Sequence, residues 1–260
     1  FNNSKYIAFP LKGFTLKWYV AMINSPSMLN ALMNSIKIGL VVAILSTILG
    51  LLAAKAVTRY RMPGRAPMVA FIMIPLVVPE IILGISLLIL LSLANIPLSL
   101  FTVGFAHLLL CVPFSMLVLV SRMEGFDRSM EEAGLDLGEN AWMTFWRVTL
   151  PQLRPGLAAG GLLVTLYVLR DFGAVSFMRY STFTRVLYIQ YQSSFDRTGA
   201  AVLALVLILL TAFVLLIEIR TRGRASYYGG HVGAVGNPVQ IQLGFWRWPS
   251  LLFCSILVIL

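Results

Sequence analysis

The ionisable residues of this chain are few, and most of its acids lie in one stretch. Six of the ten carboxylates fall between Ser121 and Gly156, in SRMEGFDRSMEEAGLDLGENAWMTFWRVTLPQLRPG, together with four arginines. Acids near the start of a short helix complement the helix dipole, and an amphipathic helix with acids on one flank suits a groove on a protein partner. The stretch therefore predicts a docking segment.

Enzyme chemistry has no residues to support it. The chain has no G-x4-G-K-[ST] phosphate-binding loop and no Gly-x-Ser-x-Gly nucleophile turn. Its histidines, His107 and His231, stand alone, and its cysteines, Cys111 and Cys254, lack metal-ligand spacing. The sequence predicts no catalytic residue, no metal centre and no cofactor, so any ATP would be hydrolysed by a partner.

Three ionisable residues interrupt apolar runs. Glu80 follows Pro79 in IPLVVPEIILG, where Pro75 and Pro79 are expected to break a membrane helix near its middle. Asp171 follows Arg170 in LRDFGAV, and His107 lies inside a third run. Ionisable residues inside a membrane are costly and usually face a cavity or a partner. Glu80, Pro79 and Asp171 are therefore candidates for a transport pathway. Alternatively, Glu80 is solvated or paired with a base near the interface, Asp171 pairs locally with Arg170, and His107 makes a hydrogen bond between helices.

The elements that must position these residues are membrane helices. A mean hydropathy of +0.88 and only 12% charged residues are atypical of a soluble domain. Because about 20 residues span the hydrocarbon core, the apolar runs predict an all-α, polytopic transmembrane bundle of five to six helices, forming one domain over residues 1–260. The runs are 38–54, 68–93, 96–120 and 200–217, with a shorter one at 157–169 and one at 251–260 that stops at the chain end.

The basic residues indicate an orientation. They lie at the ends of hydrophobic segments and form no continuous patch, which excludes nucleic-acid binding despite the net charge of +10. The loop VTRYRMPGRAP has three arginines and no acid, so the positive-inside rule places it in the cytoplasm. Alternation then puts 121–156 and 218–249 inside, and 1–34 and 170–199 outside. The polar start, FNNSKY, suggests a fragment of a longer protein, in which 250–260 begins a further span.

The acid-rich stretch is expected to form two short helices joined by a turn. Ser129 followed by Glu132 fits a capping box at the first helix. Gly138 can adopt the left-handed conformation that ends a helix. The second helix, 141–148, would be closed by Leu150 and Pro151.

The spacing across this stretch resembles the EAA loop in the membrane subunits of ATP-binding-cassette (ABC) importers. That pattern is Glu-Ala-Ala-x3-Gly-x9-Ile-x-Leu-Pro, and the matching residues here are Glu132, Ala133, Gly134, Gly138, Val148, Leu150 and Pro151. The resemblance implies the importer-permease fold in a bacterial inner membrane. It further implies that 121–156 is a cytoplasmic coupling loop docking in a cytosolic ATPase dimer, with Ala133 and Gly134 as a small contact face and Gly138 as its bend. An extracytoplasmic binding protein, a second permease half or subunit, and lipid would be the other partners.

Two kinds of importer share this resemblance. Residues 1–127, including PLVVPEIILGISLLIL, resemble the smaller membrane subunit of putrescine/spermidine importers. Residues from 146 on, including RVTLPQLRPGLAAGG, resemble the first half of double-length ferric-iron importer subunits. Ferric iron is narrowly favoured because the second region covers the outer loop and fits the double-length layout. Polyamine is the alternative, since Glu80 and Asp171 would attract ammonium groups. An ATPase-independent secondary transporter is the alternative of another class, although the inverted repeats expected of one are not seen.

Overall fold

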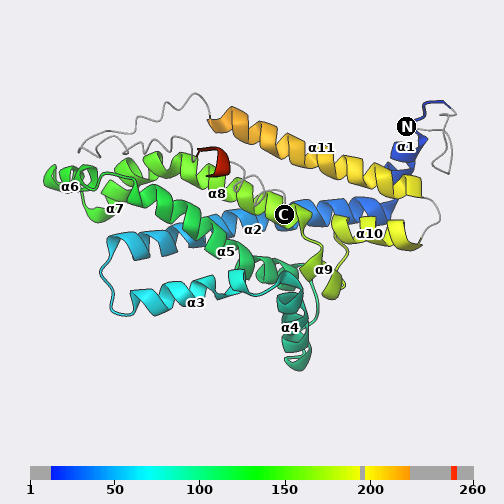
Figure 1. Cartoon of the computed structure of the whole chain (residues 1–260), viewed down its shortest axis with the longest axis horizontal. Coiled ribbons are helices and arrows are strands. Elements are labelled where there is room, and N and C mark those ends of the chain that lie inside the picture. The colour runs from blue at the N-terminus through cyan, green and yellow to red at the C-terminus, as the bar shows by residue number, and fades with distance from the viewer. Residues whose placement is uncertain (1–12, 194–196, 223–246, 251–260) are drawn as a thin grey trace. The chain divides into compact units, whose positions relative to one another are not determined.

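The structure is a computed structural model that describes residues 13–193, 197–222 and 247–250. Its architecture is all-α (Figure 1), as the apolar runs predict, and the run at 251–260 lies outside the described residues. The helices are α1 (Lys17–Ile23), α2 (Pro26–Arg59), α3 (Arg65–Val77), α4 (Glu80–Leu93), α5 (Leu100–Glu124), α6 (Ser129–Asp136), α7 (Ala141–Thr144), a π-helical turn η1 (Phe145–Thr149), α8 (Leu150–Arg170), α9 (Gly173–Phe177), α10 (Phe183–Ser193) and α11 (Arg197–Arg222).

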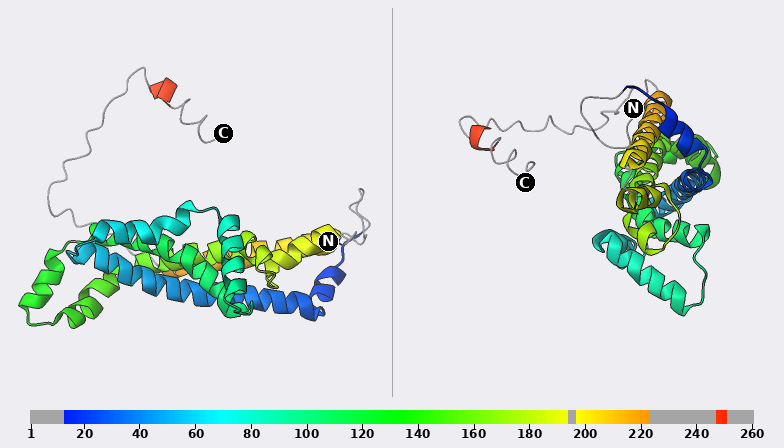
Figure 2. Two further views of the ribbon diagram at one scale, coloured as in Figure 1. Left: turned by 90° about the horizontal axis from the view of Figure 1, so that it is seen from below. Right: turned by 90° about the vertical axis from the view of Figure 1, so that its right-hand side faces the viewer.

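The core of the part spanning 13–222 is the three-helix packing of α2, α5 and α8 (Figures 1 and 2). Val42, Leu110 and Val164, one from each helix, are buried together in it. Small residues permit this packing, because a Cβ at Gly50 would lie 2.6 Å from the Cβ of Ser115 on α5. In a membrane, where lipid is as apolar as the side chains, such close backbone approach is what holds helices together.

The lengths and compositions of the helices fit a membrane bundle. Four described segments are long and apolar enough to cross a bilayer, and the pair α3–α4 makes a fifth if it is taken as one broken span. The four are Pro26–Arg59, Leu100–Glu124, Ala141–Arg170 and Thr198–Arg220. This confirms the predicted fold class.

The run at 68–93 is not one straight span. Its two helices, α3 and α4, meet at 101°, so that α4 runs across the bundle (Figures 1 and 2). The break falls at Pro79, which has no N–H to donate and holds Val78 in an extended conformation (ψ 126°). Pro75, by contrast, lies within α3. The bend places Glu80 in the first turn of α4.

The expectation that Leu150 and Pro151 close the second short helix is wrong. Both residues begin α8, which is continuous with α7 through the π-helical turn η1, so one segment runs from Ala141 to Arg170. Because Pro151 has no N–H, the hydrogen-bond ladder shifts here, and the N–H of Leu150 reaches back five residues to the carbonyl of Phe145. The end of the acid-rich stretch is therefore built rigidly into a span.

Candidate functional site

The acid-rich stretch folds into a hairpin of α6 and α7 at one end of the bundle (Figure 2). Gly138 takes a positive φ of 89° just after α6, the left-handed conformation that the sequence suggested for it. Asn140 then caps α7, its Oδ1 accepting the N–H of Met143 at 2.8 Å. A glycine turn and a side-chain cap therefore fix the angle between the two arms.

The capping box expected from Ser129 and Glu132 is absent from the start of α6. Arg128 is the N-cap and makes no side-chain cap, while Ser129 is the first helical residue. The carboxylate of Asp127 instead accepts the N–H of Ser129 at 2.9 Å, and this bond lowers the pKa of Asp127. Asp127 thus satisfies a free donor at the helix start and complements its dipole with a carboxylate that stays charged to lower pH.

Gly134 does not belong to an exposed contact face, contrary to the prediction. It is buried against α7, where an added Cβ would lie 3.2 Å from Cγ2 and 3.4 Å from Oγ1 of Thr144. Thr144 cannot easily turn away, because its hydroxyl donates to the carbonyl of Asn140 at 3.1 Å. Of the two residues predicted to form the small contact face, Ala133 and Gly134, only Ala133 is exposed. Gly134 therefore allows the two arms to pack on each other.

This packing gives a first testable expectation. Gly134→Val should overpack the contact with Thr144 and destabilise the hairpin by about 1–3 kcal/mol. Ala133→Val, at the exposed neighbouring position, is the matched control and should leave thermal unfolding unchanged. Adding Thr144→Ala to Gly134→Val removes both crowded atoms and should restore much of the loss. Equal unfolding temperatures for the Gly134 and Ala133 variants would contradict the buried role of Gly134.

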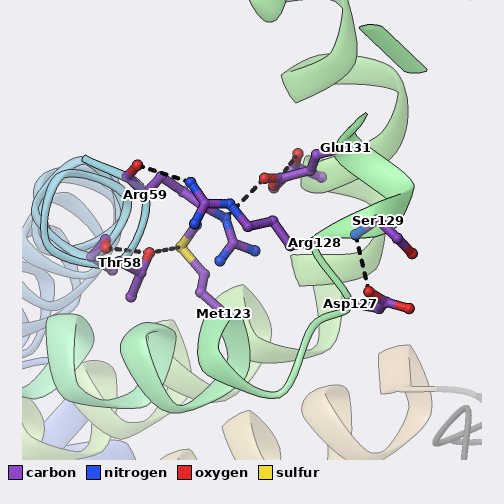
Figure 3. A network of polar contacts seen from close by, with 9 residues as sticks. Thr58, Arg59, Met123, Asp127, Arg128, Ser129 and Glu131 are labelled. Carbon is purple, nitrogen blue, oxygen red and sulfur yellow. Dashed lines mark hydrogen bonds and ion pairs between the residues drawn. The ribbon is translucent and has the colours of Figure 1, made fainter. Parts of the chain in front are cut away.

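One carboxylate, that of Glu131, attaches the hairpin to two membrane helices. Its Oε2 lies 2.8 Å from Nε of Arg59 at the end of α2, and its Oε1 accepts the hydroxyl of Thr149, next to α8, at 2.9 Å. Figure 3 shows Arg59 and Glu131 meeting beside Arg128, whose guanidinium donates to the Arg59 carbonyl at 3.4 Å. The side chains of Arg59 and Glu131 are only 12% and 17% exposed, so this ion pair is largely removed from water.

The α5 end joins the same network. The hydroxyl of Thr58 donates to the Ala54 carbonyl at 2.8 Å and approaches the sulfur of Met123 at 3.6 Å (Figure 3). Sequence reasoning missed Arg59 and Glu131 as a pair. The only available signal was that a basic loop and an acidic loop were assigned to the same side of the membrane.

Apolar and aromatic side chains surround the hairpin. Trp142, Phe145 and Trp146 form an aromatic cluster with ring centroids 5.6–6.4 Å apart. Trp146 meets the other two rings edge to face, and Trp142 and Phe145 are tilted relative to each other. Glu132, Ala133 and Leu135 on α6 are exposed, as is Leu137 just after it. The hairpin thus presents an uncovered face with both acidic and apolar groups, which fits a protein groove.

A second polar group lies at the bend before α4. The carboxylate of Glu80 is 3.8 Å from the guanidinium of Arg170, and these side chains are 40% and 70% exposed. The Arg170 guanidinium also lies over the ring of Tyr167, 5.2 Å from its centroid. Glu80 is therefore partly exposed and paired with a base, the alternative that the sequence left open.

Asp171 does not pair with its neighbour Arg170. Its Oδ2 is 3.2 Å from Nε2 of His107 on α5, and both side chains are 1% exposed. The other ring nitrogen of His107, Nδ1, is 2.8 Å from the Val103 carbonyl. Because a carbonyl only accepts, Nδ1 carries a proton and donates it to the Val103 carbonyl. The close polar contact of His107 with Asp171 thus joins α5 to the end of α8, which is a link between helices as the sequence suggested.

The Asp171 segment is also attached to α2. The carbonyl of Asp171 accepts the hydroxyl of Thr184 at 2.6 Å, and the N–H of Phe183 donates to the hydroxyl of Ser35 at 2.9 Å. The residues between α8 and α10 are therefore fixed to both α5 and α2. Asp171 and Glu80 nevertheless lie near each other, because a Cβ added at Gly173 would be 3.8 Å from Oδ1 of Asp171 and 3.7 Å from the Cβ of Glu80.

Neither polar group is arranged for bond-making chemistry, and the described residues hold no cluster of three or more His, Cys, Asp or Glu side chains suited to a metal ion. What the geometry provides is mechanical: a protruding hairpin joined to the ends of α2 and α8 in a bundle of membrane helices. That combination of membrane helices and a protruding hairpin is the architecture of a membrane transport subunit.

The chain belongs to the family of binding-protein-dependent transport system inner membrane components, whose family model matches residues 46–219. It is accordingly a multi-pass inner-membrane permease of an ABC importer, and this family decides against the ATPase-independent transporter. The spermidine/putrescine transport system permease protein PotC of Shigella flexneri is 30% identical over 235 residues, covering 89% of each chain. The Fe(3+)-transport system permease protein FbpB 2 of Haemophilus influenzae is 32% identical over 223 residues, covering 86% of this chain and 43% of that protein.

Solved structures share the fold. A bacterial alginate ABC transporter in complex with an alginate pentasaccharide-bound periplasmic protein superposes with a TM-score of 0.68, at 12% identity, over 81% of this chain and 83% of the other. An amino acid ABC transporter with histidines superposes with a TM-score of 0.62, at 15% identity, over 80% and 98%. At these identities the likeness describes the architecture alone.

Proposed function

We propose that the α6–α7 hairpin faces the cytoplasm and docks in the cleft of a separate ATPase dimer, transmitting its motion to the membrane helices. The observation that carries this proposal is the double attachment of Glu131, to Arg59 on α2 and to Thr149 beside α8. A displacement of α6 must move both spans or break a largely buried ion pair. Glu132 and Ala133, exposed on α6, would meet the ATPase, while Gly134, Gly138, Leu150 and Pro151 shape the hairpin and its continuation into α8.

The substrate proposed first is a polyamine, delivered by an extracytoplasmic binding protein to this chain and a second permease subunit. The support is that the spermidine/putrescine relative aligns over 89% of both chains, whereas the iron relative is matched over 43% of its length. Glu80, in the turn after Pro79, offers a partly exposed carboxylate, and the ring of Tyr167 lies close by. Its long ion pair with Arg170 is weak enough for a substrate ammonium to replace it.

Ferric iron, narrowly favoured by the sequence, is the second candidate. It is supported by the 32% identity to the Fe(3+) permease and by the tyrosines of the segment after Asp171. Tyr188 and Tyr191 are exposed on α10, where phenol oxygens suit a hard cation.

Uptake into proteoliposomes tests the proposal. The permease, assembled with its ATPase and binding protein, is supplied with labelled putrescine, spermidine or ferric iron, with and without ATP. ATP-dependent accumulation of a polyamine is expected, and it should require the binding protein. Accumulation of iron alone would replace the first substrate by the second. Uptake that does not depend on ATP would refute the proposed coupling.

A further inference from the structure

An apolar groove runs between α2 and α8 next to the hairpin. It has a volume of about 620 Å³ and is walled on α2 by residues from Ala43 to Leu52. On the α8 side it is lined by the small residues Ala158 and Gly161, and Trp142 and Trp146 line its hairpin end. The coupling described above makes no use of this groove.

The depth of the groove matches one leaflet of a bilayer. At 1.5 Å per residue, the α2 wall is roughly 14 Å long, and half of the hydrocarbon core is about 15 Å thick. The wall belongs to a segment that is apolar and long enough to cross the membrane. The groove therefore runs from the level of the hairpin to near the middle of the bilayer, which is the path of an acyl chain.

The end of the groove near the hairpin carries groups typical of the headgroup region. Trp142 and Trp146 are 67% and 51% exposed there, as indoles are at membrane interfaces. Lys55, one helical turn beyond Leu51, places its ammonium 4.0 Å from the ring centroid of Phe145, which also lines the groove. A cation thus lies where the phosphate of a lipid in the groove would be.

We propose that the α2–α8 groove binds an acyl chain of an anionic phospholipid whose phosphate lies beside Lys55. The cation at the mouth favours this occupant over an apolar helix, which would have no use for a charge there. The acid Glu131 does not oppose the lipid phosphate strongly, because one of its oxygens pairs with the Arg59 guanidinium and the other accepts the hydroxyl of Thr149. With the hairpin in the cytoplasm, the lipid belongs to the inner leaflet. It would then lie between the two helices that the hairpin moves.

Photocrosslinking in the assembled importer tests this site. Complexes in nanodiscs receive a trace of phosphatidylglycerol or phosphatidylcholine carrying a diazirine on the acyl chain, and labelled peptides are identified by mass spectrometry. Phosphatidylglycerol should label 43–52 and 158–165 about fivefold more than phosphatidylcholine, the preference that one lysine near the surface supplies. Lys55→Gln should remove this preference, and Lys55→Arg should keep it.

The matched control is Lys37→Gln, because Lys37 lies on the same helix, eighteen positions before Lys55. This variant should leave the labelling unchanged. Ala158→Phe, which fills the groove, should suppress labelling by both lipids. Equal labelling by the two lipids in the unaltered complex would overturn the anionic preference. Absence of labelling in both segments would show that protein covers the groove and would overturn the site, whatever the transported substrate proves to be.

Discussion

Glu131→Gln is expected to reduce ATP-driven uptake at least about tenfold while the membrane bundle stays folded. The substitution removes the carboxylate that pairs with Arg59 at 2.8 Å and leaves a guanidinium only 12% exposed without its counter-charge. Removing one partner of a buried ion pair costs about 3–5 kcal/mol. Each 1.4 kcal/mol changes the equilibrium between the attached and the detached hairpin by a factor of about ten. Because Arg59 and Glu131 retain some exposure, the lower end of that range applies. Uptake and ATPase activity, measured in the same proteoliposomes, should separate: uptake falls more than hydrolysis.

Glu139→Gln provides the matched control for this prediction. Glu139 is also a hairpin acid with one arginine partner, Arg147, at 3.0 Å, but that arginine is 64% exposed. Exposed pairs contribute only about 0.2–1 kcal/mol, so uptake should change little. Arg59→Gln should reproduce the loss seen with Glu131→Gln. If the Glu139 variant were as defective as the Glu131 variant, the general acidity of the hairpin would matter and its attachment to α2 would not.

The features that the sequence predicted correctly are those determined by local chemistry. Apolar length and composition indicated the spans. Pro75 and Pro79 indicated a break in the run 68–93, which falls at Pro79, whereas Pro75 lies within α3. Gly138 was correctly expected to take the left-handed conformation for the same local reason. The start of α8 was misplaced because Leu150 and Pro151 were interpreted as an end, although proline is equally suited to the first turn of a helix.

The features that the sequence could not provide depend on contacts between distant segments. Gly134 was expected at a surface, and only the approach of Thr144 shows that it faces inward. Arg59 and Glu131 are 72 positions apart, and neither carries a local signal of its partner. The pairing of Asp171 with His107, in preference to the adjacent Arg170, also depends on how α8 packs against α5.

His107→Leu should be the most destabilising single substitution in the membrane part. It leaves the Asp171 carboxylate, 1% exposed, without the imidazole whose Nε2 lies 3.2 Å from it. Removing one partner of a buried pair costs about 3–5 kcal/mol. The purified permease should therefore unfold at a temperature several degrees lower, as followed by fluorescence-detected size exclusion on heating. The double variant His107→Leu with Asp171→Leu removes both polar groups and should recover most of the loss, since apolar replacement of a whole buried pair is often neutral.

Asp171→Asn separates a structural from a transport role for this residue. The Asn amide can donate to Nε2 of an imidazole whose Nδ1 stays bonded to the Val103 carbonyl, so the contact between the two side chains can be kept. Thermal unfolding should then be close to that of the unaltered protein. If Asp171 only joins α5 to the end of α8, uptake should be retained as well. If the variant unfolds normally but has lost uptake, transport requires the carboxylate itself, and Asp171 would act in the pathway alongside Glu80.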